Sequence, residues 1–316
     1  MAKWADTYQL LPVSSLSVWA QEGFAAKANG ACDGLIFIGA TGIAVRAIAP
    51  YLVHKAKDPA VLSVDERGRF VVPLVAGHIG GANGLAVQVA QWLGATPVIS
   101  TATDINGCFA VDVWAAEQGY HIVQSDRIKD VSAALLAGET VGLYSDFPIR
   151  GSLPSGIQQA KSGRVGIVIS YQTEKMLFQN TLVLVPQRLS LGIGCRKGAA
   201  AEQIAQAVET VCAAFSYPLT AICEAASIDL KAEEAGLLAF CQKLRVPVRF
   251  YSAEVLRQVQ GNFSASSFVA GVTGVDNVCE RAAIKSSGGR LLVPKQVVHS
   301  VTVALAERAW EVDFGY

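Results

Sequence analysis

The stretch VPLVAGHIGGANGLA, residues 72–86, joins an apolar run to a segment with helical spacing through a loop, and it carries four glycines and one histidine. This succession predicts a strand, a glycine-rich loop and a helix. Glycines let the backbone approach a ligand closely, and a helix N-terminus presents free N–H groups to an anion. His78 adds a side chain that exchanges a proton near neutral pH. The alternative is a plain strand-to-helix turn braced by this histidine.

The segments on either side alternate in the same way. We predict strands, helices and a hairpin that turns at Glu66-Arg67-Gly68, in the order strand 33–40, helix 41–52, hairpin 60–75, helix 82–94 and strand 96–100. Strands that alternate with helices indicate an α/β layer sandwich. The first 112 residues are therefore expected to form an open α/β sheet domain.

The rest of the chain divides into a weakly patterned part and a second regular part. Residues 113–188 are predicted as a small middle α/β region with a helix at 126–138 and strands at 141–144, 164–170 and 181–186. Residues 189–316 are predicted as a C-terminal α/β domain. Its strands are expected at 189–194, 219–223, 246–252, 290–294 and 300–307, and its helices at 200–215, 231–244, 253–259 (with Ser252 as N-cap) and 276–287.

Composition narrows the class of protein. The 316 residues are 52% hydrophobic and 16% charged, and the formal net charge is zero. No global field attracts nucleic acid, so we expect no nucleic-acid partner and anionic ligands held by local groups. No secretory signal or membrane-length apolar run is present, which predicts a cytoplasmic protein without membrane association. The seven cysteines form no CxxC pair and are expected to be reduced thiols.

Two further loops follow predicted strands. IGATGIAVR (38–46) places Gly39 and Thr41 at a helix start with Arg46 one turn later, and STATDING (100–107) supplies hydroxyls and Asp104. Ligands of open α/β sheets sit at the carboxyl ends of strands. If the strands are neighbours and parallel, all three loops should converge on one cleft. Thr41 as a mere N-cap and Arg46 as a solvated side chain are the alternatives.

GIGCRKG (192–198) outlines a dinucleotide fingerprint before a helix, with Glu224 expected at the end of the next strand. Its spacing is GxGxxxG, one residue longer than the GxGxxG of that fingerprint, so it indicates such a site only weakly. Cys195 would be a nucleophile primed by Arg196 and Lys197, although an unreactive thiol is the favoured interpretation.

Several long strings, in the same order, resemble a known family. LIFIGATGIAVRAIAP, DERGRFVVPLVAGHIGGANGLA and LGATPVISTATDINGCFAVD are similar to the N-terminal half of the cobalt-precorrin-5A hydrolase family, CbiG. LVPQRLSLGIGCRKGAAAEQI, FYSAEVLRQV and GVTGVDNVCERAAI are similar to its C-terminal half, which resembles CobE. The similarity runs from about residue 33 to 307. In that family an additional strand and helix precede the first string, and the first 32 residues show no clear equivalent.

The resemblance implies a reaction and a set of partners. The substrate would be a cobalt-bound tetrapyrrole whose δ-lactone is opened by water, with release of acetaldehyde. Cobalt would arrive with the substrate, so neither a cofactor nor a protein-built metal site is expected. A homo-oligomer, or transient contact with other corrin-pathway enzymes, stays open. The alternatives are a non-catalytic corrinoid-binding protein and, less favoured, a dinucleotide-dependent enzyme.

The reaction needs a base, donors for the oxyanion and groups that hold carboxylates. The predicted catalytic residues are His78 and Asp104. Arg46 and Arg196 are expected to pair with substrate carboxylates. The full set predicted to bind substrate is Gly39, Thr41, Arg46, Gly80, Gly81, Asn83, Thr101, Thr103, Arg196 and Glu224.

Overall fold

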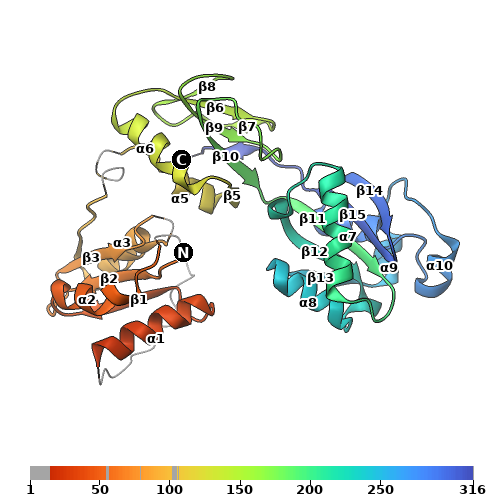
Figure 1. The fold of residues 1–316 in the computed structure, drawn as a ribbon, viewed down its shortest axis with the longest axis horizontal. Helices are drawn as coiled ribbons and strands as arrows, with labels where there is room; N and C mark the ends of the chain where they lie inside the picture. Colours follow the sequence, from red (N-terminus) through yellow and green to blue (C-terminus); the bar gives the residue numbers. More distant parts are fainter. Residues whose placement is uncertain (1–14, 55–56, 79, 102–104, 106, 316) are drawn as a thin grey trace. The chain divides into compact units, whose positions relative to one another are not determined.

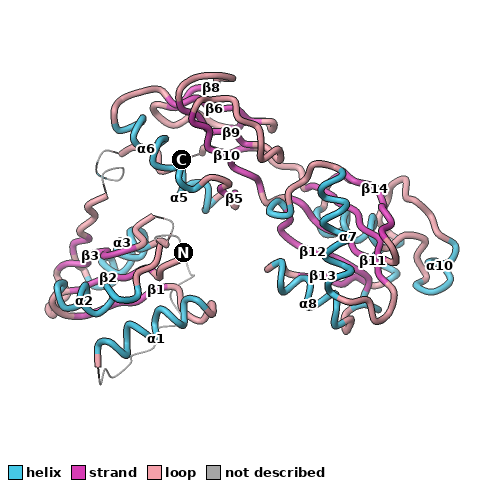
Figure 2. The backbone as a smooth tube through the Cα atoms, viewed as in Figure 1, coloured by secondary structure: helices cyan, strands magenta, loops and turns pink. Residues whose placement is uncertain are grey.

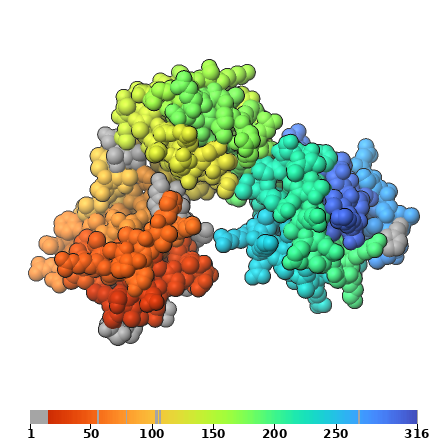
Figure 3. Space-filling view, in the orientation of Figure 1, coloured from red at the N-terminus to blue at the C-terminus, as the bar shows by residue number. Residues whose placement is uncertain are grey.

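The computed structural model describes residues 15–54, 57–78, 80–101, 105 and 107–315. The chain divides into two compact units, Met1–Trp114 and Ala115–Tyr316. The fold is α/β throughout, as predicted (Figure 1). In the space-filling view, colours from red to orange mark the N-terminal unit and colours from yellow to blue mark the second unit (Figure 3). In the described part of the chain, no helix is both long enough and apolar enough to cross a bilayer.

The N-terminal unit is built on a four-stranded sheet. Its order is β1 (Gly34–Ile38), β2 (Ala60–Val64), β3 (Phe70–Val75) and β4 (Thr96–Pro97). Strands β1 and β2 are parallel, whereas β2 and β3 form the predicted antiparallel hairpin. Strand β4 runs parallel to β3. The first two strands therefore point one way and the last two point the other way.

Helices cover both faces of this sheet, which is why every residue of β2 is buried. Alternate side chains of a strand point to opposite faces. Leu62 packs with the helix α3 (Ala82–Leu93), while Val61 packs with residues of α1 (Leu16–Ala28) and α2 (Thr41–Ile48). A single 3₁₀ turn containing Pro50 follows α2.

Helix α1 lies within the first 32 residues, where the sequence predicted no helix. Ser15 caps the helix by accepting a hydrogen bond from the Val18 N–H at 3.2 Å. Ala20 and Leu35 share one apolar cluster, so the helix covers β1. Its apolar residues are spread around the helix and give no single stripe, which is why the sequence pattern did not predict it.

Strand β1 is also less buried than predicted. Ile36 and Ile38 are 41% and 66% exposed, and the expectation of a fully buried strand is wrong. The reason is its position, because β1 is at the edge of the sheet and α3 packs mainly on β2 and β3.

The second unit begins with a five-stranded sheet. Its order is β5 (Tyr120–Ile122), β10 (Asn180–Pro186), β9 (Val165–Ile169), β6 (Val141–Ser145) and β8 (Ile157–Gln159). The predicted middle strands are all found, and only β5 runs antiparallel. Helix α6 (Ile128–Leu136) packs on β6, β9 and β10. Helix α5 (Val111–Glu117) crosses the boundary between the units.

A second five-stranded sheet follows in the same unit (Figure 2). Its order is β13 (Val248–Tyr251), β12 (Ile222–Ile228), β11 (Leu189–Cys195), β15 (Val301–Glu307) and β14 (Arg290–Val298). Helices cover both faces. They are α7 (Ala201–Ala214) and α8 (Ala235–Leu244) on one face, and α9 (Ala253–Arg257) and α11 (Cys279–Ser287) on the other, with the short α10 (Ser267–Thr273) beside them.

The two sheets of the second unit share one hydrophobic core. Val183 and Val185 of the first sheet belong to the same cluster as Leu189 and Leu191 of the second. The C-terminal segment returns to the first sheet, where β16 (Val312–Asp313) pairs with β7 (Ile149–Arg150). The predicted boundary at 188/189 therefore falls between two sheets that are packed together.

Candidate functional site

The loop between β3 and α3 is a tight turn that only small residues permit. Ala76 and Gly81 both have positive φ, 58° and 81°. The N–H of Gly81 donates to the His78 carbonyl at 2.8 Å, and the N–H of Asn83 donates to the Gly77 carbonyl at 2.9 Å. A Cβ at Gly80 would overlap the Cβ of Ala76. The glycines therefore serve the turn, and the turn fixes the backbone of His78.

His78 faces a carboxylate. Its Nδ1 lies 3.5 Å from Oδ2 of Asp112, which sits in the first turn of α5. The imidazole is 18% exposed and the carboxylate only 5% exposed. A mostly buried carboxylate beside a partly exposed imidazole is the arrangement by which proteins orient a histidine for proton transfer.

Asp112 is held in its ionised form. Burial raises the pKa of its carboxyl, but the interaction with His78 and the N–H groups of Val113 and of Asp112 itself outweigh burial, so the pKa lies below its ordinary value. The Val113 N–H donates to Oδ1 at 3.1 Å. The residue is therefore an acceptor at neutral pH and not a proton donor.

The loop after β4 meets the glycine loop, as predicted. The side chain of Asn83 is buried at the start of α3, and its Nδ2 donates to Oγ1 of Thr101 at 2.9 Å. A Cβ at Gly77 would lie 2.9 Å from Oδ1 of Asn83, so this amide packs directly against the loop backbone. Asn83 and Thr101 thus brace the segment that carries His78. The predicted residues Thr103 and Asp104 lie outside the described residues.

The first loop does not join this site, and the prediction of one shared cleft is wrong for Gly39 and Thr41. Strand β1 pairs in parallel with β2, and β2 pairs antiparallel with β3. The carboxyl ends of β1 and β3 therefore lie at opposite ends of the sheet, measured along the strands. Thr41 is not the N-cap of α2, a position that Ala40 takes. Its hydroxyl lies 3.1 Å from the hydroxyl of Ser63. Arg46 is exposed in the last turn of α2.

Glu224 is also placed differently from the prediction. Strand β12 begins at Ile222, so Glu224 is its third residue and does not end the strand. It accepts a hydrogen bond from the Ser190 hydroxyl at 2.6 Å and pairs with Arg249 at 2.9 Å. Because β11 and β12 are parallel, Glu224 lies at the opposite end of these strands from the exposed Arg196.

The structure does not favour the dinucleotide interpretation of GIGCRKG. Gly192 and Gly194 lie inside β11 and not in a loop. A Cβ at Gly192 would overlap the carbonyl oxygen of Cys279, so this glycine allows α11 to approach the sheet. Burial raises the pKa of the Cys195 thiol despite the nearby Lys231, and the thiol is not a primed nucleophile.

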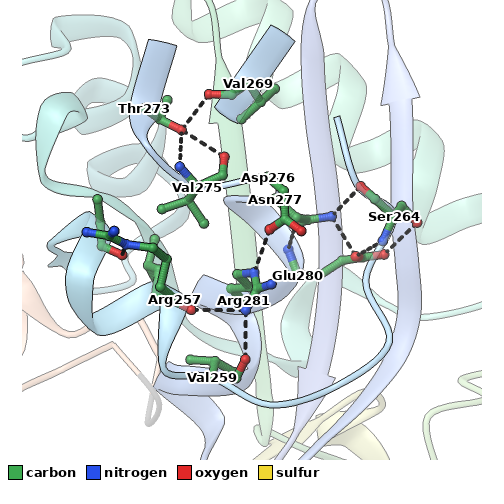
Figure 4. A network of polar contacts seen from close by, with 12 residues as sticks. Arg257, Val259, Ser264, Val269, Thr273, Val275, Asp276, Asn277, Glu280 and Arg281 are labelled. Carbon is green, nitrogen blue, oxygen red and sulfur yellow. Dashed lines mark hydrogen bonds and ion pairs between the residues drawn. The ribbon is translucent and has the colours of Figure 1, made fainter. Parts of the chain in front are cut away.

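A second polar cluster surrounds Glu280 in the second unit (Figure 4). Glu280 is 1% exposed. Its carboxylate accepts hydrogen bonds from the N–H of Ser264 at 2.8 Å, the amide of Asn277 at 2.6 Å and the N–H of Lys295 at 2.6 Å. Arg281 beside it pairs with Asp276 at 3.0 Å. Both carboxylate oxygens of Glu280 accept hydrogen bonds from the protein. The cluster therefore holds the loop around Ser264 against α11 and β14.

Among the described residues of this site, Asp112 is the one that sequence reasoning missed. It is a single acid within FAVDVWAA, 34 positions after His78, and no spacing rule links the two. Only the chain path through α3 and β4 brings them together.

Comparison with known proteins agrees with this fold. Three family profiles match in order: the Cobalamin synthesis G N-terminal profile over 24–104, the Cobalamin biosynthesis central region over 109–186 and the Cobalamin synthesis G C-terminus over 189–306. A cobalt-precorrin-5A hydrolase of Salmonella typhimurium is 37% identical, with 90% of this chain and 85% of the relative covered.

Two further relatives are similar. A cobalt-precorrin-5A hydrolase of Priestia megaterium is 31% identical over 86% of this chain and 78% of the relative. Protein CobE of a Sinorhizobium species is 34% identical over 37% of this chain and 79% of its own length. With profiles matched along almost the whole sequence, the chain belongs to the CbiG family.

Proposed function

We propose that the protein is a cobalt-precorrin-5A hydrolase of cobalamin biosynthesis and that His78 is its general base. Family membership and the two hydrolases that match across most of the chain support the activity. The observation that supports the role of His78 is its position at a glycine loop, partly exposed and facing the buried carboxylate of Asp112. Neither a binding-only protein nor a dinucleotide-dependent enzyme is favoured by these relatives.

The proposed chemistry begins with attack on the lactone. A lone pair of water adds to the lactone carbonyl carbon while one proton of that water passes to His78. The tetrahedral oxyanion collapses, the bond to the ring oxygen breaks, and the histidine returns the proton to that oxygen. This gives a free acetate side chain and a hydroxyl on the extruded carbon.

Loss of acetaldehyde then follows. The hydroxyl loses its proton, its oxygen forms the carbonyl of acetaldehyde, and the bond to the macrocycle breaks. The electron pair stays on the ring carbon, which takes up a proton. The whole reaction consumes one water and needs no oxidant or reductant.

The first step also needs donors for the oxyanion and groups that hold the substrate. The N–H groups of Gly81, Ala82 and Asn83 at the N-terminus of α3 already donate to carbonyls of the glycine loop, so they are not proposed as the oxyanion donors. Arg196 stays a proposed partner of substrate carboxylates. Arg46 belongs to α2, which begins at the carboxyl end of β1, and this end of the sheet is opposite to the one that carries His78. Arg46 is therefore not part of the proposed site.

Three further parts of the proposal concern the surroundings of the reaction. Cobalt arrives bound to the substrate and no cofactor is used. The protein works in the cytoplasm.

The test is release of acetaldehyde from cobalt-precorrin-5A by the full-length protein, trapped as a hydrazone. We expect His78→Gln and His78→Ala to lower turnover by ~10²–10⁴-fold, the usual contribution of a positioned proton-transfer group. His121→Gln is the matched control, because His121 is an exposed residue of β5 in the second unit.

Two outcomes would contradict the proposal. Substrate binding without acetaldehyde release by the unaltered protein would favour a corrinoid-binding protein. Substantial turnover by His78→Gln would remove His78 as the base and leave it as a brace of the loop.

A further inference from the structure

We propose that Asp112 is a positioning residue: its carboxylate keeps the proton of neutral His78 on Nδ1, so that Nε2 is the nitrogen that accepts a proton from the attacking water. This inference rests on the proposed function for its consequence, but not for its geometry. Neutral imidazole has one protonated and one basic nitrogen, and the partner of one nitrogen decides the state of the other.

The contact between His78 and Asp112 shows which ring nitrogen faces the carboxylate. Nδ1 is the atom 3.5 Å from the Asp112 carboxylate. The pKa of this carboxyl lies below its ordinary value, so the group is an acceptor at neutral pH and attracts an N–H. The separation is longer than an ideal hydrogen bond, and such bonds often shorten when substrate binds.

Both partners are fixed by their elements, so the pair is more than a chance contact of two mobile side chains. The backbone of His78 is held in the turn by the N–H of Gly81 at 2.8 Å, and the loop is braced by Asn83 and Thr101. Asp112 is 5% exposed and lies on a helix. A side chain buried to that extent has few rotamers available, which favours one ring orientation of His78.

The consequence for catalysis is a correctly oriented base. With the proton on Nδ1, the lone pair on Nε2 takes the proton of water, and Asp112 stabilises the imidazolium that forms. Asp112 itself stays ionised. With the opposite tautomer, the nitrogen facing Asp112 would hold the lone pair and Nε2 would have no pair to offer.

The experiment reads the tautomer directly by long-range ¹H–¹⁵N correlation of the imidazole nitrogens. The spectra are recorded without substrate, about two units above the ordinary imidazole pKa of ~6.5. His78→Gln assigns the signals among the four histidines. In the unaltered protein we expect His78 with a protonated Nδ1 and an unprotonated Nε2. A protonated Nε2 there would overturn the inference, whether or not any variant folds.

Asp112→Asn tests the cause. It keeps size and one side-chain oxygen but removes the charge, so the two nitrogen shifts should move toward each other or exchange places. Turnover should fall by ~10²–10⁴-fold with substrate affinity unchanged within ~3-fold. Asp112→Glu, which restores a carboxylate, should recover part of the turnover and the Nδ1–H signal.

Asp58→Asn is the matched control. Asp58 is another buried acid of the N-terminal unit, and it accepts hydrogen bonds from the N–H groups of Val53 and His54. This variant should keep both the His78 tautomer and the turnover. An unchanged tautomer in Asp112→Asn, or an equal loss of turnover in Asp58→Asn, contradicts the positioning role. Absence of acetaldehyde release with the expected tautomer would instead contradict only the proposed function.

Discussion

At the scale of single residues, the contact between His78 and Asp112 should also appear in the pH dependence of stability. The pKa of Asp112 is lower in the folded protein than its ordinary value, so folding favours the ionised form. This contribution is fully present above the ordinary carboxyl pKa of about 4 and is lost as the pH falls through the lowered native pKa.

Asp112→Asn removes this contribution at every pH. The free energy of unfolding should therefore differ between the unaltered protein and the variant at neutral pH, and the difference should shrink as the pH falls from about 5 toward 2. Urea unfolding followed through amide signals of the N-terminal unit measures it. A difference that stays constant over this range would contradict the lowered pKa.

At the scale of elements, the sequence predicted most strands and helices but not their directions. The hairpin 60–75 was recognised from its turn, and the same hairpin reverses β3 relative to β1. That reversal separates Gly39 from His78, although the two loops have similar local sequences. Local patterns report which residues are apolar and where turns fall, whereas strand order depends on contacts between distant residues. The pair His78 and Asp112 could not be predicted for the same reason.

GIGCRKG shows that a glycine pattern can serve packing and not a ligand. Gly192→Ala would place a methyl group against the carbonyl of Cys279, so α11 must shift away from β11. We expect a loss of about 1–3 kcal/mol in the free energy of unfolding, the range for overpacked cores. Thermal or urea unfolding of the purified variant measures this.

Gly194→Ala is the control in the same strand. Its methyl group would meet only the hydroxyl of Thr302, the end of a side chain that can rotate. Gly194→Ala should therefore lower the free energy of unfolding less than Gly192→Ala does. Equal stability of the unaltered protein and Gly192→Ala would show that α11 does not pack as closely as described.

At the scale of the whole molecule, the two sheets of the second unit are joined by buried polar and aromatic contacts as well as by the shared core. The Tyr171 hydroxyl donates to Glu307 at 2.7 Å, and Trp310 donates to the same oxygen at 3.3 Å. The rings of Phe147 and Trp310 are 4.6 Å apart. Glu307 ends β15, so its carboxylate connects the second sheet to the loop after β9.

Tyr171→Phe tests whether this joint makes the two sheets unfold together. The variant leaves the buried Glu307 without one of its donors and should lower the free energy of unfolding by about 1.5–3 kcal/mol, the usual value of a hydrogen bond to a charged group. Because the sheets share one core, hydrogen exchange should accelerate by similar factors in β9 and β15. Tyr217→Phe is the control. Tyr217 packs edge-on against Tyr171 at 5.4 Å between ring centroids, but the tyrosine hydroxyl that donates to Glu307 is that of Tyr171. Acceleration confined to one sheet would mean that residues 113–188 and 189–316 unfold as separate domains despite the contacts between them.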